Sequence, residues 1–504
     1  MTSPDQNVYQ AFSSRFPADG ERLFIEGFDG RRVRYGEVDA ITARMANALA
    51  AAGVCQGDRV AGLLEKSPEG ILLYLAACRM GAVYVPVSTG LTPVEVAYVI
   101  EDSAPKVVVC DPAWASHVGH GRSQAPPAVM TLDTAGGGSF MDACASQSSS
   151  FSTASGRGND PNAIVYTSGT TGQPKGAILT NGLVTWNAIV LSDTWKITHD
   201  DVLLHANPMA FGLFGTTTPV VANGAAMLLL PKFDAQQVIE RLPRATMFAG
   251  VPTYYTRLLD HPAFNRDVCR GMRLFICGSA PMRADVFNEF TERTGHVLLD
   301  RYGSTEALLV TSNLVDDARR PDTSGLPLPG SKLRVLDEHR KPVKPGEVGT
   351  IEVWQPWMFA GYLNAPEKTR AAFTDDGWFI TGDFGRVDER GYVTVLGRGT
   401  DLIISGGFNV YPKEVETCIN RLPNVVESAV VGVPHRDFGE AVVAVIELKD
   451  KGAAFDKAAA TAALKKELAG YKVPKRIEVI DEMPRNTLGK IQKKLLKERF
   501  SSAH

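Results

Sequence analysis

Thr167-Ser-Gly-Thr-Thr-Gly-Gln-Pro-Lys-Gly176 is the stretch of this chain that says most about its fold. It follows the apolar run Ala163-Ile-Val-Tyr166, and a β-branched run that ends in glycines and hydroxyls is typical of a strand feeding a loop. Glycines let backbone N–H groups turn inward, hydroxyls add donors, and Lys175 adds a mobile positive charge. These groups suit a polyphosphate, although a plain surface turn is the alternative. The order is not that of the GxxxxGK[ST] loop, because no Ser or Thr follows the lysine.

The composition is that of an ordinary globular protein, and the length predicts more than one hydrophobic core. At 504 residues, 44% apolar and 22% charged, it is too long for one domain. A net charge of −3 gives no reason to expect nucleic acid as a partner. The 9 histidines and 7 cysteines lack metal-ligand spacing, so we expect reduced thiols and no metal cage. The first residues lack a signal sequence and no apolar run approaches a membrane span, so we expect a cytoplasmic protein with no membrane partner.

Alternating strands and helices are expected in the first part of the chain. Apolar strands at 59–64 and 82–87 enclose a helix at 69–80, and such alternation predicts sheets covered on both faces. Residues 134–158 are rich in glycine, serine and alanine, which predicts a loop. After about residue 330, short strands separated by Gly, Pro and Asp turns predict a small β unit that closes the larger region.

A compact α+β segment is expected at the end of the chain. It begins near Gly397-Arg-Gly-Thr-Asp401, where glycines flank charged residues in a composition that suits a hinge. We therefore predict an α/β protein whose large N-terminal domain, residues 1–398, holds αβ-layered sheets plus the small β unit. A small mobile α+β C-terminal domain, residues 399–504, follows it.

Three further motifs follow predicted strands. Leu274-Phe-Ile-Cys-Gly-Ser-Ala-Pro281 ends in a place where a flat ligand could lie against the backbone. In Asp300-Arg-Tyr-Gly-Ser-Thr-Glu306 the aromatic ring could stack on a purine, the threonine could reach a phosphate and Glu306 could hold Mg²⁺ through oxygen. The carboxylate of Thr381-Gly-Asp383 could accept both ribose hydroxyls. Taken singly, Tyr302 is as well explained by a half-buried core tyrosine, and Asp383 by a turn.

With these motifs in order, the chain resembles the adenylate-forming superfamily of acyl-CoA synthetases, nonribosomal adenylation domains and luciferases. The match spans essentially the full length and adds Gly397-Arg398, Gly406-Gly-Phe-Asn-Val-Tyr-Pro412 and Pro484-Arg-Asn-Thr-Leu-Gly-Lys490. The resemblance implies ATP, Mg²⁺ and coenzyme A. It also implies two half-reactions, in which a carboxylate attacks ATP to give an acyl-adenylate and a thiol then attacks the adenylate after the small domain has rotated.

The resemblance implies a role for each motif residue. The ATP site comprises Thr167, Ser168, Gly169, Thr170, Thr171, Gly172, Lys175, Gly278, Ser279, Ala280, Pro281, Asp300, Tyr302, Gly303, Ser304, Asp383 and Arg398. The catalytic residues are Lys490, Thr305 and Glu306, with Glu306 also the Mg²⁺ ligand; the hinge is Thr400 and Asp401, and the pantetheine tunnel of CoA is lined by Gly406, Gly407 and Phe408. For Lys490 the alternative is a solvated basic face shared with Lys493, Lys494 and Lys497.

The acid substrate is predicted from two arginines. Arg301 stands where most acyl-CoA synthetases have glycine, and a buried arginine needs an anionic partner, which a second substrate carboxylate would supply. Arg257 lies on the helix that borders the same pocket in the family, and Ser279 is the third residue predicted to contact the acid. This pattern resembles malonyl-CoA synthetases and predicts malonate or methylmalonate. The alternatives are an internal salt bridge of Arg301 to Asp300, and a surface position for Arg257.

Other functions stay open at this point. A small aliphatic or aromatic monocarboxylic acid is the alternative substrate, and an enzyme that loads a carrier protein or a silent binding protein are the alternative classes. Because the chain ends soon after Lys490, we expect a free-standing enzyme that uses CoA.

Two departures from the family pattern affect these predictions. Asn207-Pro-Met-Ala-Phe-Gly-Leu-Phe-Gly215 is shortened and lacks the histidine of malonyl-CoA synthetases, and His205 just upstream is no obvious replacement. Thr400 stands where relatives carry Asp or Lys.

Overall fold

The computed structural model describes residues 7–118, 126–167, 174–279, 282–317, 319–405, 408–435, 438–468, 470–486 and 489–501. The chain divides into two compact units. The first comprises Met1–Lys332 and Val353–Phe379, and the second Leu333–Glu352 and Ile380–His504. The predicted boundary after residue 398 lies inside the second unit, and its role as a pivot stays a prediction.

A six-stranded sheet in the first unit has the order β6-β5-β3-β4-β7-β8 and is parallel except for β8. Its strands are β3 (Arg59–Leu63), β4 (Val83–Val87), β5 (Val107–Cys110), β6 (Ala128–Thr131), β7 (Pro161–Thr167) and β8 (Lys175–Thr180). The predicted strands at 59–64 and 82–87 are confirmed as β3 and β4. Every residue of β4 is buried, as expected for a strand covered on both faces.

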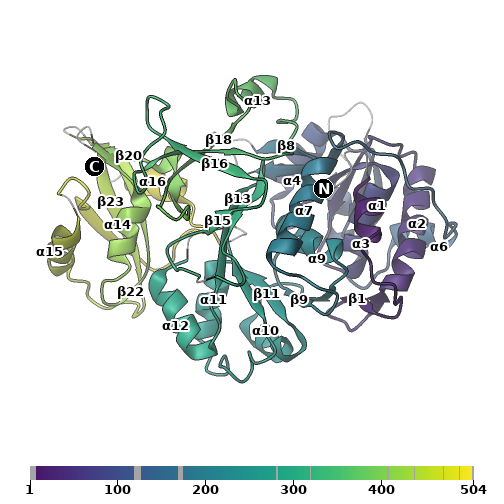
Figure 1. Ribbon diagram of the computed structural model, residues 1–504, viewed down its shortest axis with the longest axis horizontal. Helices are drawn as coiled ribbons and strands as arrows, with labels where there is room; N and C mark the ends of the chain where they lie inside the picture. Colours follow the sequence, from purple (N-terminus) through teal and green to yellow (C-terminus); the bar gives the residue numbers. More distant parts are fainter. Residues whose placement is uncertain are drawn as a thin grey trace. The chain divides into compact units, whose positions relative to one another are not determined.

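Helices surround this sheet (Figure 1). They are α1 (Val8–Ser13), α2 (Tyr35–Ala51), α3 (Pro68–Met80), α4 (Pro93–Ser103), η1 (Pro112–Trp114), α5 (Ala115–Val118) and α6 (Ser139–Ala145). The predicted helix at 69–80 is α3, which begins where Ser67 accepts the N–H of Gly70 and ends at Gly81 with φ of 69°. The loop predicted at 134–158 is wrong in part, because it contains α6. Phe140 and Cys144 of α6 are buried, and α6 packs on α2.

A nine-stranded sheet completes the first unit, with the order β15-β14-β13-β12-β11-β9-β10-β1-β2. Its strands are β1 (Leu23–Glu26), β2 (Arg32–Arg34), β9 (Val202–His205), β10 (Ala226–Leu229), β11 (Met247–Gly250), β12 (Leu274–Cys277), β13 (Leu299–Ser304), β14 (Leu308–Ser312) and β15 (Leu326–Pro327). The six strands from β13 to β1 are parallel. Their carboxyl ends therefore lie at one edge of the sheet.

A large aromatic core lies between this sheet and the helices α10 (Ala235–Arg241), η3 (Leu242–Arg244), α11 (Pro252–Leu259) and α12 (Ala284–Thr294). The other helices of the first unit are α7 (Asn181–Thr194), α8 (Met209–Gly212), η2 (Leu213–Thr217), α9 (Thr218–Ala222) and α13 (Pro366–Ala372). Helix α11 packs on β11 and on α12, as Figure 1 shows. Phe248, Phe275 and Phe290 are fully buried in this core.

The second unit contains two smaller sheets. The predicted small β unit is a sheet of β16 (Lys332–Leu336), β17 (Gly349–Trp354), β18 (Phe379–Val387) and β19 (Val393–Arg398). After η4 (Gly399–Asp401), the other sheet has β20 (Ile403–Ser405), β21 (Phe408–Val410), β22 (Val425–His435), β23 (Gly439–Leu448) and β24 (Arg476–Ile480). Its helices are α14 (Pro412–Ile419), α15 (Lys457–Glu467) and α16 (Lys493–Ser501). The predicted α/β class with a C-terminal α+β region is confirmed.

Within the described ranges, no helix combines the length and apolar character needed to cross a membrane.

Candidate functional site

The parallel strands of the nine-stranded sheet collect the residues predicted to bind the acid. In register, His205 of β9 pairs with Ala249, Gly250 of β11 with Cys277, and Cys277 of β12 with Asp300 of β13. Four predicted parts of the acid site begin at or beyond these residues. They are the segment after Pro208, helix α11, Gly278-Ser279 and Arg301. Ligands of open α/β sheets bind at the carboxyl ends of parallel strands. The predicted acid-binding segments therefore start along one such edge.

Gly278 and Ser279 form a strained turn at the end of β12. Ser279 has a φ of 70°, which L-residues rarely adopt and which is often found at binding sites. A Cβ on Gly278 would lie 2.5 Å from both Cζ and Nε of Arg301. A larger residue at this position would therefore have to displace the side chain of Arg301, which lies against the backbone of Gly278. The neighbouring predicted residues Ala280 and Pro281 fall outside the described part of the chain.

Arg301 carries a buried nitrogen without a partner. Its Nε is fully enclosed and forms no hydrogen bond to any residue the structure describes. Burial lowers the pKa of this guanidinium below its ordinary value. The alternative of an ion pair to Asp300 is not what the structure contains, because the carboxylate of Asp300 accepts the backbone N–H of Arg301 at 2.7 Å instead. A Cβ at Gly215 would lie 3.7 Å from Nη2 of Arg301, so the guanidinium also reaches the altered segment.

Arg257 has a different environment. It is exposed on α11, whereas Tyr255 of the same helix is buried and donates its hydroxyl to the carbonyl of Ile276 at 2.6 Å. Among the described residues none forms an ion pair with Arg257. Its contact with the acid stays a prediction.

The shortened segment that lacks histidine folds as α8 followed by a π-helical turn, η2. Such turns are frequent at functional sites. His205 packs beneath it: its Nε2 lies 3.0 Å from Oγ1 of Thr217, and a Cβ on Gly212 would lie 2.8 Å from the ring. Burial, and then the charge of Lys66, hold the pKa of His205 well below its ordinary value. His205 is therefore a neutral, enclosed side chain that supports the segment from below.

Glu306 lies just beyond β13 in a tight turn to β14. Gly303 sits so close to the returning strand that a Cβ there would lie 2.0 Å from the carbonyl oxygen of Leu308. Tyr302 is half-buried, and Thr305 lies in the turn. The carboxylate of Glu306 is buried, and its Oε1 accepts the hydroxyl of Tyr362 at 2.8 Å. Tyr362 contacts this predicted site residue, but no signal in the sequence predicted it, because a single tyrosine far along the chain carries no pattern of its own.

The two ends of the phosphate loop are held by paired strands and tyrosines. Thr167 of β7 pairs with Lys175 of β8. Tyr166 donates to Asp102 of α4 at 2.6 Å, and Tyr98 of α4 donates to the carbonyl of Pro174 at 3.0 Å. The predicted residues Ser168, Gly169, Thr170, Thr171 and Gly172 lie outside the described residues.

The remaining predicted ATP residues and the predicted catalytic lysine, Lys490, belong to the second unit. Asp383 and Arg398 face each other on β18 and β19, and Oδ1 of Asp383 lies 3.1 Å from Nε of Arg398. Desolvation, and then the charge of Arg398, lower the pKa of Lys490, while Asp401 and Asp383 act in the opposite direction. The structure therefore brings these four predicted residues into one electrostatic group.

Lys490 differs from the other lysines of the chain terminus. Lys493 pairs with Glu416 at 2.6 Å, and Lys497 pairs with Glu440 at 2.7 Å. Lys490, by contrast, forms no ion pair with a described residue. The alternative of a solvated basic face shared by these lysines therefore fits poorly. The catalytic role of Lys490 stays a prediction.

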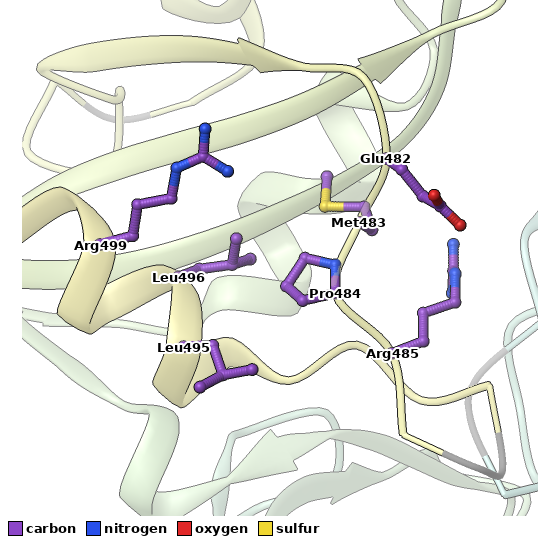
Figure 2. Close-up of a pocket in the computed structure, with 7 residues that line it drawn as sticks. All are labelled: Glu482, Met483, Pro484, Arg485, Leu495, Leu496 and Arg499. Atoms are coloured by element: carbon purple, nitrogen blue, oxygen red, sulfur yellow. The ribbon is translucent and has the colours of Figure 1, made fainter.

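A pocket of about 440 Å³ lies behind the loop that carries Lys490, between residues 482–485 and α16. In Figure 2, Arg485 and Arg499 lie on opposite sides of it. Its lining residues are Glu482, Met483, Pro484, Arg485, Leu495, Leu496 and Arg499. None of them is a predicted site residue, so we assign no substrate to this pocket.

The predicted CoA and hinge residues are described only in part. Gly406 and Gly407 lie outside the described residues, while Phe408 is 55% exposed and stacks on Tyr471 with ring centroids 4.6 Å apart. Thr400 and Asp401 form the short turn η4. Their roles stay predictions.

The donor set of the first unit fits Mg²⁺. Mg²⁺ in nucleotide sites typically takes one or two carboxylates together with substrate phosphates. Glu306 supplies one carboxylate: Tyr362 engages Oε1, and no described side chain donates to Oε2. No cluster of three or more His, Cys, Asp or Glu that could hold a metal ion occurs in the described part of the chain.

Comparison with known proteins shows which family this chain belongs to. Residues 11–363 match the AMP-binding enzyme family, and residues 414–490 match the AMP-binding enzyme C-terminal domain. The chain belongs to the AMP-binding enzyme family. The predicted resemblance to adenylate-forming acyl-CoA synthetases is therefore confirmed.

Relatives of this AMP-binding enzyme are similar over nearly their whole length. A feruloyl-CoA synthase of Amycolatopsis is 35% identical, covering 94% of each chain. A malonate–CoA ligase of Arabidopsis thaliana is 31% identical, covering 98% of this chain and 89% of the other. The structure of ATP-bound MatB from Rhodopseudomonas palustris is 46% identical with a TM-score of 0.95, covering 99% of each. The AMP-binding enzyme is thus an AMP-forming acyl-CoA synthetase that uses ATP, Mg²⁺ and CoA, and it resembles malonyl-CoA synthetases.

Proposed function

We propose that this acyl-CoA synthetase converts malonate or methylmalonate to its CoA thioester. The observation that carries the proposal is the buried Nε of Arg301, which no described residue satisfies. An enclosed cation with an unused donor is costly unless an anion pairs with it. A dicarboxylate has one carboxylate for the reaction and a second that can accept two parallel hydrogen bonds from the guanidinium.

The reaction consists of two displacements. A carboxylate oxygen of the acid attacks the α-phosphorus of ATP, the bond to the β-phosphate oxygen breaks, and pyrophosphate leaves. The thiol of CoA then loses its proton and attacks the acyl carbon, which releases AMP. We infer that the segment 399–401 acts as the hinge between the two steps and that Gly406, Gly407 and Phe408 line the path of the pantetheine arm.

We assign the first step to Lys490. Its ammonium would lie against the attacking carboxylate and the α-phosphate, where negative charge gathers in the transition state. This is electrostatic stabilisation and positioning rather than proton transfer. The absence of an ion pair to any described residue supports the assignment, because an ammonium already paired to a carboxylate would have less attraction left for substrate.

The phosphates and the ribose have separate partners. We propose that the loop 167–176, with Lys175, holds the phosphates that leave as pyrophosphate, that Thr305 reaches the α-phosphate and that Asp383 accepts the ribose hydroxyls. Gly278, Ser279 and Tyr302 would lie against the adenine. Bound Mg²⁺ would neutralise phosphate charge, with Glu306 as its protein ligand.

A monocarboxylic acid is the main alternative to malonate as the substrate. A relative that is 35% identical is named for ferulate, an aromatic acid, so an aromatic or short-chain monocarboxylic acid is the competing proposal. The shortened segment around Gly215 favours it, because a changed backbone beside Arg301 changes the shape of the pocket. A carrier protein as thiol acceptor is the second alternative.

A pyrophosphate-release screen tests the proposal. The parent enzyme and Arg301→Gly are assayed with malonate, methylmalonate, butyrate, benzoate and ferulate, with and without CoA. We expect malonate-type acids to give the highest kcat/KM, and Arg301→Gly to lower that value about 100-fold while sparing monocarboxylates, since truncating one partner of a buried charge pair costs several kcal/mol. Stimulation by monocarboxylates alone, with Arg301→Gly harmless, would overturn the dicarboxylate. Adenylate formation without CoA turnover would indicate a carrier protein.

The location of the enzyme is also a proposal. All 7 cysteines are free thiols, which suits a reducing compartment such as the cytoplasm.

A further inference from the structure

Tyr362 connects two parts of the ATP site that lie far apart in the sequence. Its hydroxyl donates to Oε1 of Glu306 at 2.8 Å. Its ring lies beneath the ammonium of Lys175, with Nζ 5.2 Å from the ring centroid. One side chain thus touches both the proposed metal carboxylate and the phosphate-loop lysine.

The backbone around Tyr362 is fixed to the same strand that carries Lys175. Ala177 of β8 forms a β-bridge with Tyr362, and the N–H of Leu363 donates to the carbonyl of Gly176 at 2.8 Å. The N–H of Tyr362 donates to Oγ1 of Thr369 at 2.8 Å. The ring is therefore held from its own backbone before any ligand binds.

We propose that Tyr362 is a positioning residue that orients Glu306 toward the metal and Lys175 toward the phosphates of ATP. The proposal rests on the functions proposed above for those two residues. A hydroxyl donor on one carboxylate oxygen fixes the rotation of the carboxyl group and leaves the other oxygen for a cation. Partners of this kind tune metal affinity although they do not touch the metal. The electron-rich face of the ring, in turn, attracts the ammonium and holds it in place. Unlike an anion, the ring does not neutralise its positive charge.

The two contacts can be separated by substitution. Tyr362→Phe keeps the ring under Lys175 and removes only the hydroxyl on Glu306. Tyr362→Leu removes both. Tyr35→Phe is the matched control, because Tyr35 is a buried tyrosine of α2 whose hydroxyl donates to a backbone carbonyl, that of Ala225, at 2.7 Å.

The experiment measures ATP binding by calorimetry, with and without Mg²⁺ and with no acid or CoA present. For Tyr362→Phe we expect the Kd of ATP in Mg²⁺ to rise about 10-fold, the usual effect of losing such a partner, and the Kd of metal-free ATP to stay unchanged. For Tyr362→Leu we expect metal-free binding to weaken several-fold as well. Tyr35→Phe should match the parent in both titrations.

Two results would overturn the inference. One is a Tyr362→Phe enzyme that binds ATP in Mg²⁺ as tightly as the parent. The other is equal loss with and without Mg²⁺ together with a lowered Tm, which would mean that the hydroxyl only supports the fold. Glu306→Gln tests the premise that Glu306 is the metal ligand. If Mg²⁺ strengthens ATP binding by this variant as much as by the parent, Glu306 is not the metal ligand and the inference is wrong as well. Because no acid is present, failure of the malonate proposal leaves these results unaffected.

Discussion

Arg485 donates to the carbonyl of Gly489 at 2.9 Å and forms an ion pair with Glu427 of β22. Gly489 is the residue before Lys490. The same short loop is closed by Asn486, whose side chain accepts the N–H of Lys490 at 2.9 Å and whose own N–H donates to the carbonyl of Lys490 at 2.9 Å. Lys490 is therefore held by a loop that is itself anchored to the sheet, which is the kind of support that the catalytic role proposed for it would require.

Removing the anchor should affect one half-reaction more than the other. We expect Glu427→Gln to free Arg485 and to lower acyl-adenylate formation about 10-fold, since a small misplacement of a positioned group is costly. Thioester formation from supplied acyl-adenylate should change less than twofold. Single-turnover assays of the two half-reactions make the measurement.

An exposed ion pair in the same unit gives the control. Arg421 and Glu467 are 65% and 51% exposed, so Glu467→Gln should leave both half-reactions unchanged. Equal losses in both half-reactions of Glu427→Gln would indicate a general folding defect and contradict the positioning role.

Lys490→Ala should remove the main electrostatic contribution to the first step. We expect acyl-adenylate formation to fall by at least 10²–10³-fold, about the effect of deleting one preorganised donor. Conversion of supplied acyl-adenylate to thioester should persist. Lys494→Ala is the matched control, because Lys494 is an exposed lysine of α16. Loss of both half-reactions in Lys490→Ala would refute the assignment.

The pH dependence of adenylation should also reveal Lys490. Its ammonium is the active form, and its pKa is lowered, first by desolvation and then by Arg398. Adenylation should therefore decline as the pH rises through a value below that of an ordinary lysine. In Arg398→Gln, the pH at which adenylation declines should be higher than in the parent, independently of any change in the maximal rate. If that pH is unchanged in the variant, a group other than Lys490 causes the decline.

Local sequence patterns predicted the elements of the fold well because those patterns report burial and chain reversal. The strands β3 and β4 and the helix α3 follow directly from apolar runs and from the caps Ser67 and Gly81. Helix α6 was missed because its Gly/Ser/Ala-rich composition resembles a loop. What stabilises α6 is the burial of Phe140 and Cys144, which is a property of the tertiary structure.

The site was predictable only where its residues form contiguous motifs. Glu306 was predicted because it ends a strand-and-turn motif, whereas Tyr362, which contacts it, lies 56 residues away and joins it only through folding. Likewise, the sequence shows Gly278 and Arg301 in separate motifs, and their contact depends on the pairing of β12 with β13. Long-range contacts of this kind carry no local periodicity, so pattern analysis cannot supply them.

The contact between Gly278 and Arg301 gives a further prediction. A methyl group at Gly278 would collide with the guanidinium, so Gly278→Ala should raise the KM for malonate at least about 10-fold by displacing the arginine. In an Arg301→Gly background the same substitution should have much less effect on the KM for malonate, because the colliding group is gone. Initial-rate kinetics of the two single variants and the double variant measure this coupling. Additive effects would show that the arginine is not what Gly278 accommodates.

His205 should make the stability of the first unit depend on pH. Burial, followed by the charge of Lys66, holds its folded pKa well below 6.5, whereas the unfolded chain protonates it near its ordinary value. Below pH 6.5 the unfolded state therefore binds a proton that the folded state does not, and the free energy of unfolding falls as the pH falls. His205→Gln should flatten the decline in Tm over this range, while His339→Gln, at a side chain that is 73% exposed, should keep the parent slope. Parallel Tm curves for the parent and His205→Gln would contradict a neutral, buried His205, because the proton uptake would then belong to other groups.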